Sequence, residues 1–136
     1  MSRTPIEGVN HVTLAVRDLE RSLEFYTDRL AFELCARWRE GAHLRAGTLW
    51  LCLSHDPSAK PAAGYSHLAL STDAEGLAWL RERLPASSIW KPDTSEGASL
   101  YFVDPDGHRL EAHVGSLESR LAYLRERPYP GMVWPD

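Results

Sequence analysis

The chain has 136 residues, of which 43% are hydrophobic and 25% are charged, and these values are typical of one ordinary globular domain rather than a fibre or a disordered chain. Its formal net charge is -4 with Lys and Arg spread along the sequence, which makes nucleic acid an unexpected partner. No apolar run approaches the roughly 20 residues needed to cross a bilayer, and the first residues lack the apolar core of a signal peptide, so we expect a cytoplasmic protein without a membrane partner.

The first part of the chain predicts a strand, a helix and three further strands. Residues 10–16 alternate apolar and polar side chains, as a half-buried strand does. Asp18 is a typical N-cap, and apolar residues at helical spacing extend a helix toward Leu30. Three more strands are expected at 32–38, 42–46 and 48–54.

A Pro- and Gly-rich linker follows, and then the same order of elements returns. Residues 65–71 predict a strand, and Asp73 caps a helix that runs to about Leu84. Further strands lie between 90 and 114, and a short helix is expected at about 117–127.

The two halves also match residue by residue. An offset of 56 residues relates several pairs: His11 and His67, Leu14 and Leu70, Gly41 and Gly97, Ala42 and Ala98, and Leu44 and Leu100. The last strands align at an offset of 59, which pairs Leu51 with Leu110 and Cys52 with Glu111. The sequence therefore predicts an α+β fold made of two βαβββ modules in a single domain over residues 1–136. Its parts are module one at about 8–55, a linker at 56–64, module two at about 65–115, and a C-terminal helix and tail at 116–136.

Three side chains on the predicted strands suit a metal ion. His11, His67 and Glu111 each lie on the face of a strand that points away from the helices, and the repeat brings these strands together around a shared cavity. Two imidazoles and a carboxylate can bind a divalent first-row metal and leave positions open for a substrate. One histidine or one glutamate on a strand is more often a packed or solvated side chain than a metal ligand. The equivalent positions of these residues in the repeat favour the metal site. Cys52 is a wall residue or a soft ligand, and we favour the wall.

Other polar residues could join the same cavity. Lys91, Tyr101, Arg120 and Thr13 suggest an anionic ligand, although Lys91 and Arg120 could equally be solvated surface charges. The polar loop at 95–99 is a candidate ion cradle or an ordinary surface turn.

Structural roles are expected for most of the other notable residues. The Asp-Pro-Asp-Gly run at 104–107 is a tight-turn signature, and Trp50 is a packing residue or a pocket wall. Cys35 and Cys52 are too few for a disulfide framework and are expected to be buried thiols. Four histidines lack a repeat partner among the candidate ligands and are treated as non-ligands: His43, His55, His108 and His113.

Several of these stretches carry a family resemblance that covers nearly the whole chain. They are residues 10–16, 47–54, 95–97 with Ser99, 102–114 and 119–121. The chain resembles the vicinal oxygen chelate superfamily and, within it, the fosfomycin-resistance glutathione transferases of the FosA type. The run Asp-Pro-Asp-Gly-His-Arg-Leu-Glu-Ala-His-Val at 104–114 is the most specific marker.

The resemblance implies a domain-swapped homodimer with two cup-shaped metal sites. Its metal would be Mn(II), or another divalent ion, bound by His67 and Glu111 of one chain and His11 of the other. The reaction would add the thiol of glutathione to the epoxide of fosfomycin, assisted by K+ in the loop with Glu96 and Gly97.

Further roles follow from the matching residues. The phosphonate would be bound by five of them: Lys91, Ser95, Ser99, Tyr101 and Arg120. Thr13 would lie near the oxirane oxygen, Trp50 and Tyr65 would be pocket walls, and Trp38 and Ser54 would line the glutathione channel.

The chain departs from the resemblance at two positions. His43 stands where relatives often have a tyrosine, and Ala98 replaces an acidic residue often found in the loop. Three alternatives to the glutathione transferase are another thiol transferase, an epoxide hydrolase on the same fold, and a drug-binding protein without enzymatic activity. A dioxygenase or glyoxalase-like isomerase does not require the cluster of Lys91, Tyr101 and Arg120.

Overall fold

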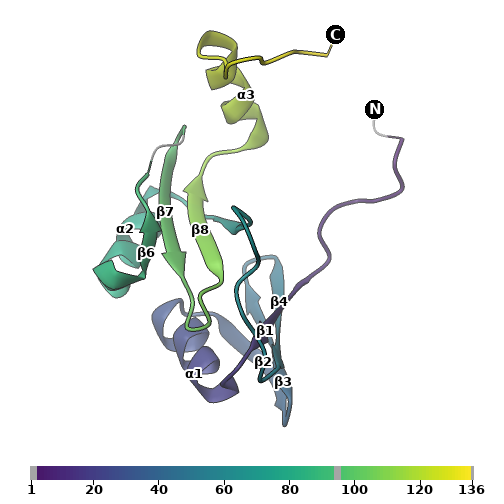
Figure 1. The fold of residues 1–136 in the computed structure, drawn as a ribbon, viewed down its shortest axis with the longest axis vertical. Helices are drawn as coiled ribbons and strands as arrows, with labels where there is room; N and C mark the ends of the chain where they lie inside the picture. Colours follow the sequence, from purple (N-terminus) through teal and green to yellow (C-terminus); the bar gives the residue numbers. More distant parts are fainter. Residues whose placement is uncertain (1–2, 94–95, 136) are drawn as a thin grey trace. The chain divides into compact units, whose positions relative to one another are not determined.

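The computed structural model describes residues 3–93 and 96–135, and the chain divides into two compact units (Figure 1). The first unit comprises residues up to 63 together with 104–108, and the second comprises 64–103 and the residues from 109 onward. Each unit contains a four-stranded sheet and has the order strand, helix, strand, strand, strand. The α+β class with two βαβββ modules is therefore confirmed.

In the first unit the strands follow the order β1-β4-β3-β2, with β1 and β4 parallel and the other neighbours antiparallel. The elements are β1 (Val12–Val16), α1 (Leu19–Glu24), β2 (Glu33–Trp38), β3 (Gly41–Ala46) and β4 (Leu49–His55). Asp18 caps α1 as predicted, because its carboxylate accepts the backbone N–H of Arg21 at 3.1 Å. A π-helical turn over Phe25–Arg29 then extends the helix toward Leu30.

The core of the first unit lies between α1 and one face of this sheet. Leu44, Leu51 and Leu53 are at most 1% exposed, and α1 packs on β4. Each leucine buried in this way contributes about 1.5–3 kcal/mol relative to an exposed one. Because side chains alternate along a strand, Trp50 and Cys52 of β4 point to the opposite, uncovered face.

The second unit repeats this arrangement with strand order β5-β8-β7-β6, and β5 and β8 are parallel. The elements are β5 (Leu68–Ser71), α2 (Ala74–Arg83), β6 (Ile89–Lys91), β7 (Ala98–Val103), β8 (Arg109–Val114) and α3 (Leu117–Glu126). A short 3-10 turn over Ala86–Ser88 precedes β6. Helix α2 packs on β7 and β8 (Figure 1). Its Leu77 is buried, as are Phe102 of β7 and Leu110 of β8.

The strand registers support the repeat at its first and last strands. Val12 pairs with Leu51 in the first sheet, and Leu68 pairs with Leu110 in the second. These pairs carry the predicted offsets of 56 and 59 residues, so each His-bearing segment lies beside the equivalent last strand in both units.

The third strands correct the predicted alignment. Leu44 pairs with Leu51, whereas Phe102 pairs with Leu110, so β3 and β7 are related by 58 residues and not by 56. A slip of two residues leaves every side chain on the same face of a strand, and the apolar pattern therefore could not distinguish the two offsets. The corrected pairs are Gly41 with Ser99 and His43 with Tyr101.

The turn between β7 and β8 belongs to the first unit and is held there by two buried carboxylates. Asp104 accepts the Tyr26 hydroxyl at 2.8 Å, and Asp106 accepts Nε of Arg17 at 3.0 Å. Burial raises the pKa of Asp104. Burial also acts to raise the pKa of Asp106, but hydrogen bonds from Arg17 and Ser22 outweigh it and lower that pKa. The Asp-Pro-Asp-Gly run thus has the structural role expected from the sequence.

The expectation that Cys35 is buried is wrong. It is exposed on β2, which is an outer strand of the first sheet, and its Sγ lies 3.7 Å from Nη2 of Arg45. Apolar neighbours in the sequence did not reveal that this strand is left uncovered. Cys52 is half-buried. In the part of the chain that the structure describes, no helix is long and apolar enough to cross a membrane.

Candidate functional site

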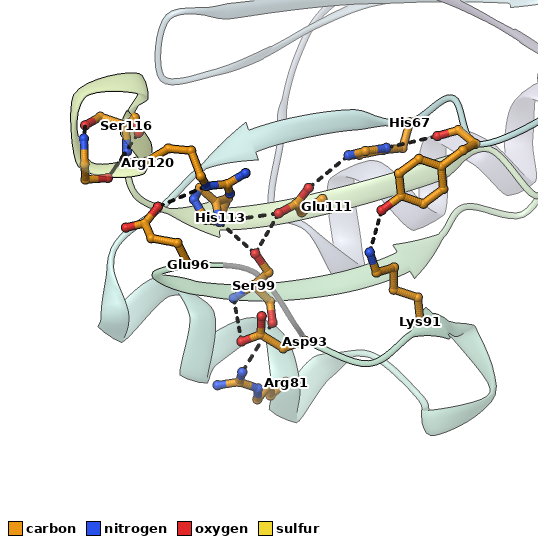
Figure 2. Close-up of polar contacts among 12 residues, drawn as sticks. His67, Arg81, Lys91, Asp93, Glu96, Ser99, Glu111, His113, Ser116 and Arg120 are labelled. Atoms are coloured by element: carbon orange, nitrogen blue, oxygen red, sulfur yellow. Dashed lines mark hydrogen bonds and ion pairs between the residues drawn. The ribbon is translucent and has the colours of Figure 1, made fainter. Parts of the chain in front are cut away.

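A histidine and a glutamate meet on the face of the second sheet that carries Tyr101. His67 lies just before β5 and Glu111 lies on the adjacent parallel strand β8, with Nε2 of His67 3.0 Å from Oε1 of Glu111 (Figure 2). Glu111 is 5% exposed and the His67 side chain is 23% exposed. The carboxylate is therefore held over the sheet and is not aimed at solvent.

The second oxygen of Glu111 is held by a serine and approached by another histidine. Oγ of Ser99 on β7 lies 2.6 Å from Oε2 of Glu111 and 2.7 Å from Nδ1 of His113. Figure 2 shows Ser99 between these two side chains. Nδ1 of His113 is itself 3.4 Å from Oε2. His113 was expected to be a non-ligand, and the contact of its side chain with Ser99 was not predicted. The signal was available, because residues two apart on a strand share one face.

A fixed positive charge lies nearby in the same unit. Nζ of Lys91 donates to the hydroxyl of Tyr65 and lies 4.7 Å from the ring centre of Tyr101. The hydrogen bond to Tyr65 raises the pKa of Lys91, so its amine is protonated at neutral pH. Tyr101 is 3% exposed and pairs with Glu111 across β7 and β8. The rings of Tyr65 and Tyr101 also approach His67, at 5.2 and 6.3 Å.

The predicted ion loop is partly described. Oε1 of Glu96 accepts Nε of Arg120 at 3.2 Å, which ties the loop to α3. Gly97 has a φ of 79°, and a Cβ there would lie 2.2 Å from the carbonyl oxygen of Val114, so only glycine fits. Ser95 lies outside the described residues.

The other predicted site residues lie in the first unit. His11 stacks on Trp50 with ring centres 4.3 Å apart, and the Trp38 ring lies 4.8 Å from that of His43. Trp50 and Trp38 are 41% and 44% exposed. Thr13 on β1 and Ser54 on β4 are also exposed. A site that combines these residues with Glu111, His67 and Lys91 of the second unit stays a prediction.

The pair formed by His67 and Glu111 fits part of a metal site. Two ligand atoms bound at about 2.1 Å and at right angles lie about 3.0 Å apart, which is the separation of Nε2 and Oε1. Among the described residues no group of three His, Cys, Asp or Glu side chains is arranged to hold a metal ion. The pair therefore needs at least one further donor, and His11 is the predicted one.

Comparison with known proteins gives consistent matches. The family model described as Glyoxalase/Bleomycin resistance protein/Dioxygenase superfamily matches residues 8–112. The chain is 47% identical to the glutathione transferase FosA of Serratia marcescens over 95% of this chain and 96% of that protein. It is 35% identical to the metallothiol transferase FosB of Staphylococcus epidermidis, over 88% of this chain and 90% of that protein.

Solved structures of fosfomycin resistance proteins have the same fold. FosX of Listeria monocytogenes superposes with a TM-score of 0.74 at 28% identity, covering 87% of this chain and 98% of that one. An E126Q mutant of the same protein, in complex with Mn(II) and 1S,2S-dihydroxypropylphosphonic acid, superposes with a TM-score of 0.72 at 29% identity. The latter match covers 86% of this chain and 98% of that one.

Proposed function

Because the chain belongs to the glyoxalase/bleomycin resistance protein/dioxygenase superfamily and, within it, to the fosfomycin-resistance glutathione transferases of the FosA type, we propose that it is a Mn(II)-dependent enzyme that adds glutathione to the epoxide of fosfomycin. The observation that carries the proposal is the carboxylate–imidazole pair of Glu111 and His67 beside the cation of Lys91. A metal-binding pair next to a fixed positive charge suits a small substrate with an anionic end.

The relatives support the choice of metal, substrate and thiol. The 47% identical protein is named a glutathione transferase, and FosX has been crystallised with Mn(II) and a dihydroxypropylphosphonic acid. A phosphonate carries negative charge, which matches the protonated Lys91 and the guanidinium of Arg120.

The residues take the following roles in the proposal. Glu111 and His67 would hold Mn(II) together with His11 of the partner subunit, and the metal would act there as a Lewis acid toward the epoxide oxygen. Lys91, Arg120 and Tyr101 bind the phosphonate with Ser95 and Ser99, which orients one epoxide carbon toward the thiol. Thr13 lies near the epoxide oxygen, Trp50 and Tyr65 form walls, Trp38 and Ser54 face the glutathione, and Glu96 and Gly97 belong to a K+ loop.

The reaction balances without a protein nucleophile. The sulfur of glutathione forms a bond to an epoxide carbon, the bond from that carbon to the epoxide oxygen breaks, and the proton of the thiol ends on that oxygen. A cytoplasmic location follows from this chemistry, because glutathione is the thiol pool of the cytosol.

Product mass tests the reaction directly. The protein with Mn(II) is incubated with fosfomycin and glutathione, with cysteine, or with no thiol, and the products are weighed by mass spectrometry. We expect a product heavier than fosfomycin by the mass of glutathione, and no consumption after the metal is removed with a chelator. Equal consumption without a thiol would identify an epoxide hydrolase, and a cysteine adduct alone would identify another thiol transferase.

The shared site requires a homodimer, which mixing two inactive chains can test. His11→Ala and Glu111→Ala disable different donors, so a mixed dimer of a domain-swapped protein has one intact site and one site without either donor. Unfolding the two variants together and refolding them should restore activity that neither has alone. If activity does not return, or if sedimentation shows a monomer at micromolar concentration, the shared site is wrong.

A further inference from the structure

His113 is a histidine that none of the proposed roles uses, although it lies in the most buried polar cluster of the second unit. Its side chain is 15% exposed, and its Nδ1 lies 2.7 Å from Oγ of Ser99 (Figure 2). In the first sheet the position equivalent to His113 is Ser54, which is exposed. The contact made by His113 is therefore a feature of the second sheet alone.

The donors and acceptors in the contacts among Glu111, Ser99 and His113 follow from the hydrogens that each group can supply. A glutamate that binds a metal is ionised and only accepts hydrogen bonds. The single proton of the Ser99 hydroxyl therefore points to Oε2 of Glu111, at 2.6 Å. The Ser99 oxygen is left to accept, and Nδ1 of His113 must carry the hydrogen that it receives.

Two glycines confine the ring of His113. A Cβ on Gly115 would lie 2.5 Å from its Nε2, and a Cβ on Gly97 would lie 3.2 Å from its Cε1. The ring fills a slot that exists because both positions lack a side chain. A confined ring loses little further freedom when it makes a hydrogen bond, so it can hold the serine in one rotamer.

We infer that His113 is a positioning residue that acts through Ser99 on the metal-binding carboxylate. The chain of hydrogen bonds runs from Nδ1–H of His113 to Oγ of Ser99 and from Ser99 O–H to Oε2 of Glu111, which leaves Oε1 turned toward His67. This role rests on the proposed metal function. In this role Ser99 holds the Glu111 carboxylate even when no substrate is bound.

Three substitutions at one position separate hydrogen bonding from packing. The amide of His113→Asn can donate from close to the place of Nδ1, the amide of His113→Gln reaches instead toward the place of Nε2, and His113→Leu fills the slot without a donor. We expect Mn(II) affinity near that of the wild type for the Asn variant and a loss of about 10–100-fold for the Gln and Leu variants. Free Mn(II) is measured by its electron paramagnetic resonance signal, which needs no substrate.

Three further variants complete the series. His55→Leu alters a half-buried histidine of the first unit and should leave Mn(II) affinity unchanged. Ser99→Ala should lose as much affinity as His113→Leu, and the double variant little more, because both remove the same chain. Retained affinity in the Leu variant, or equal losses in the Asn and Leu variants with native circular dichroism, would overturn the role.

A second readout uses the metal-free protein. Long-range nitrogen–proton correlation spectra should show a hydrogen on Nδ1 of His113, and a change at Nδ1 in Ser99→Ala. The opposite tautomer would contradict the inference. Normal Mn(II) binding without fosfomycin consumption would reject the proposed reaction and leave His113 to be judged by the affinity series. A wild-type protein that binds no Mn(II) would reject both.

Discussion

The two sheets share strand order and corresponding strand pairs, but the face that carries Trp50 and the face that carries Glu111 differ in chemistry. In the first unit that face presents rings, with His11 stacked on Trp50 and Trp38 close to His43. In the second it presents a buried glutamate, a lysine and hydroxyl groups. The strand registers relate the two sets position by position: Cys52 with Glu111, Gly41 with Ser99, His43 with Tyr101, and Ala36 with Lys91.

The difference shows how one backbone supports two kinds of surface. A Cβ at Gly41 would lie 2.6 Å from the carbonyl oxygen of Leu53 and 2.7 Å from the ring of Trp38, so the backbone and the indole together occupy the space where a side chain would begin. At the equivalent position of the second sheet the hydroxyl of Ser99 holds Glu111. The pairing of the strands determines where a side chain lies, and the residue type determines whether that position carries a charge. The second sheet therefore carries a carboxylate held by a hydroxyl group on this face, and the first carries stacked aromatic rings.

Exchanging the equivalent residues Glu111 and Cys52 for close analogues tests this contrast most strongly. Glu111→Gln removes a proposed ligand charge and should weaken Mn(II) binding by at least about 10-fold, since even the loss of a supporting contact reaches that size. If the thiol of Cys52 is a wall residue, Cys52→Ala should change Mn(II) affinity less than 2-fold. Substitutions away from special structural features usually change the free energy by no more than about 0.5 kcal/mol. Metal titration calorimetry of both variants decides. Equal losses would mean that Cys52 is a metal ligand and not a wall residue.

Lys91→Met tests whether the charge on the second sheet binds the substrate. A hydrogen bond to a charged group contributes about 1.5–3 kcal/mol, so the KM for fosfomycin should rise roughly 10–100-fold while Mn(II) affinity stays unchanged. Lys60→Met, at an exposed lysine of the first unit, is the matched control. Steady-state kinetics with saturating thiol measures the effect, and an unchanged KM would remove Lys91 from the phosphonate site.

Asp106→Asn tests the anchored turn that joins the last two strands of the second sheet. Asp106 has a fully buried side chain and accepts hydrogen bonds from Arg17 and Ser22, so the variant should lose about 1–3 kcal/mol of unfolding free energy at pH 7. Because the folded-state pKa of Asp106 is lowered, this stabilisation is present above the unfolded value of about 3.9 and is lost as the pH falls through the folded value.

Urea unfolding of the wild type and the variant at pH 7 and below pH 4 measures that dependence. The difference in unfolding free energy should shrink in acid. Glu7→Gln, an exposed residue of the same unit, should stay within about 0.5 kcal/mol of the wild type at both pH values. A difference that is constant with pH would show that the charge of Asp106 does not stabilise the turn.

His43→Phe is expected to have the smallest effect. The variant keeps a ring beside Trp38 and Trp50 but removes the nitrogen that accepts the Trp50 indole N–H at 3.1 Å. The loss of one exposed hydrogen bond should cost at most about 1 kcal/mol and lower the melting temperature by a few degrees. Thermal unfolding measures this loss. A collapse of Mn(II) affinity in this variant would contradict the expectation that His43 is a non-ligand.

The sequence by itself determined the elements and the repeat. Alternating apolar residues located the strands, Asp18 and Asp73 marked the helix starts, and both helices begin there because the carboxylates accept free backbone N–H groups. The offsets of 56 and 59 placed His67 beside the strand of Glu111, and the two side chains lie 3.0 Å apart. These features could be predicted because they depend on local periodicity and on the spacing of matched residues.

Only the tertiary structure decided the alignment of the third strands and the contacts that depend on it. A slip of two residues preserves the alternation of a strand, so the sequence could not show that Ser99, and not Gly97, corresponds to Gly41. The contact of His113 with Ser99 follows from that register and from the slot between two glycines. Contacts between side chains on different strands depend on strand pairing and on side-chain rotamers. The periodicity of a single strand predicts neither of these.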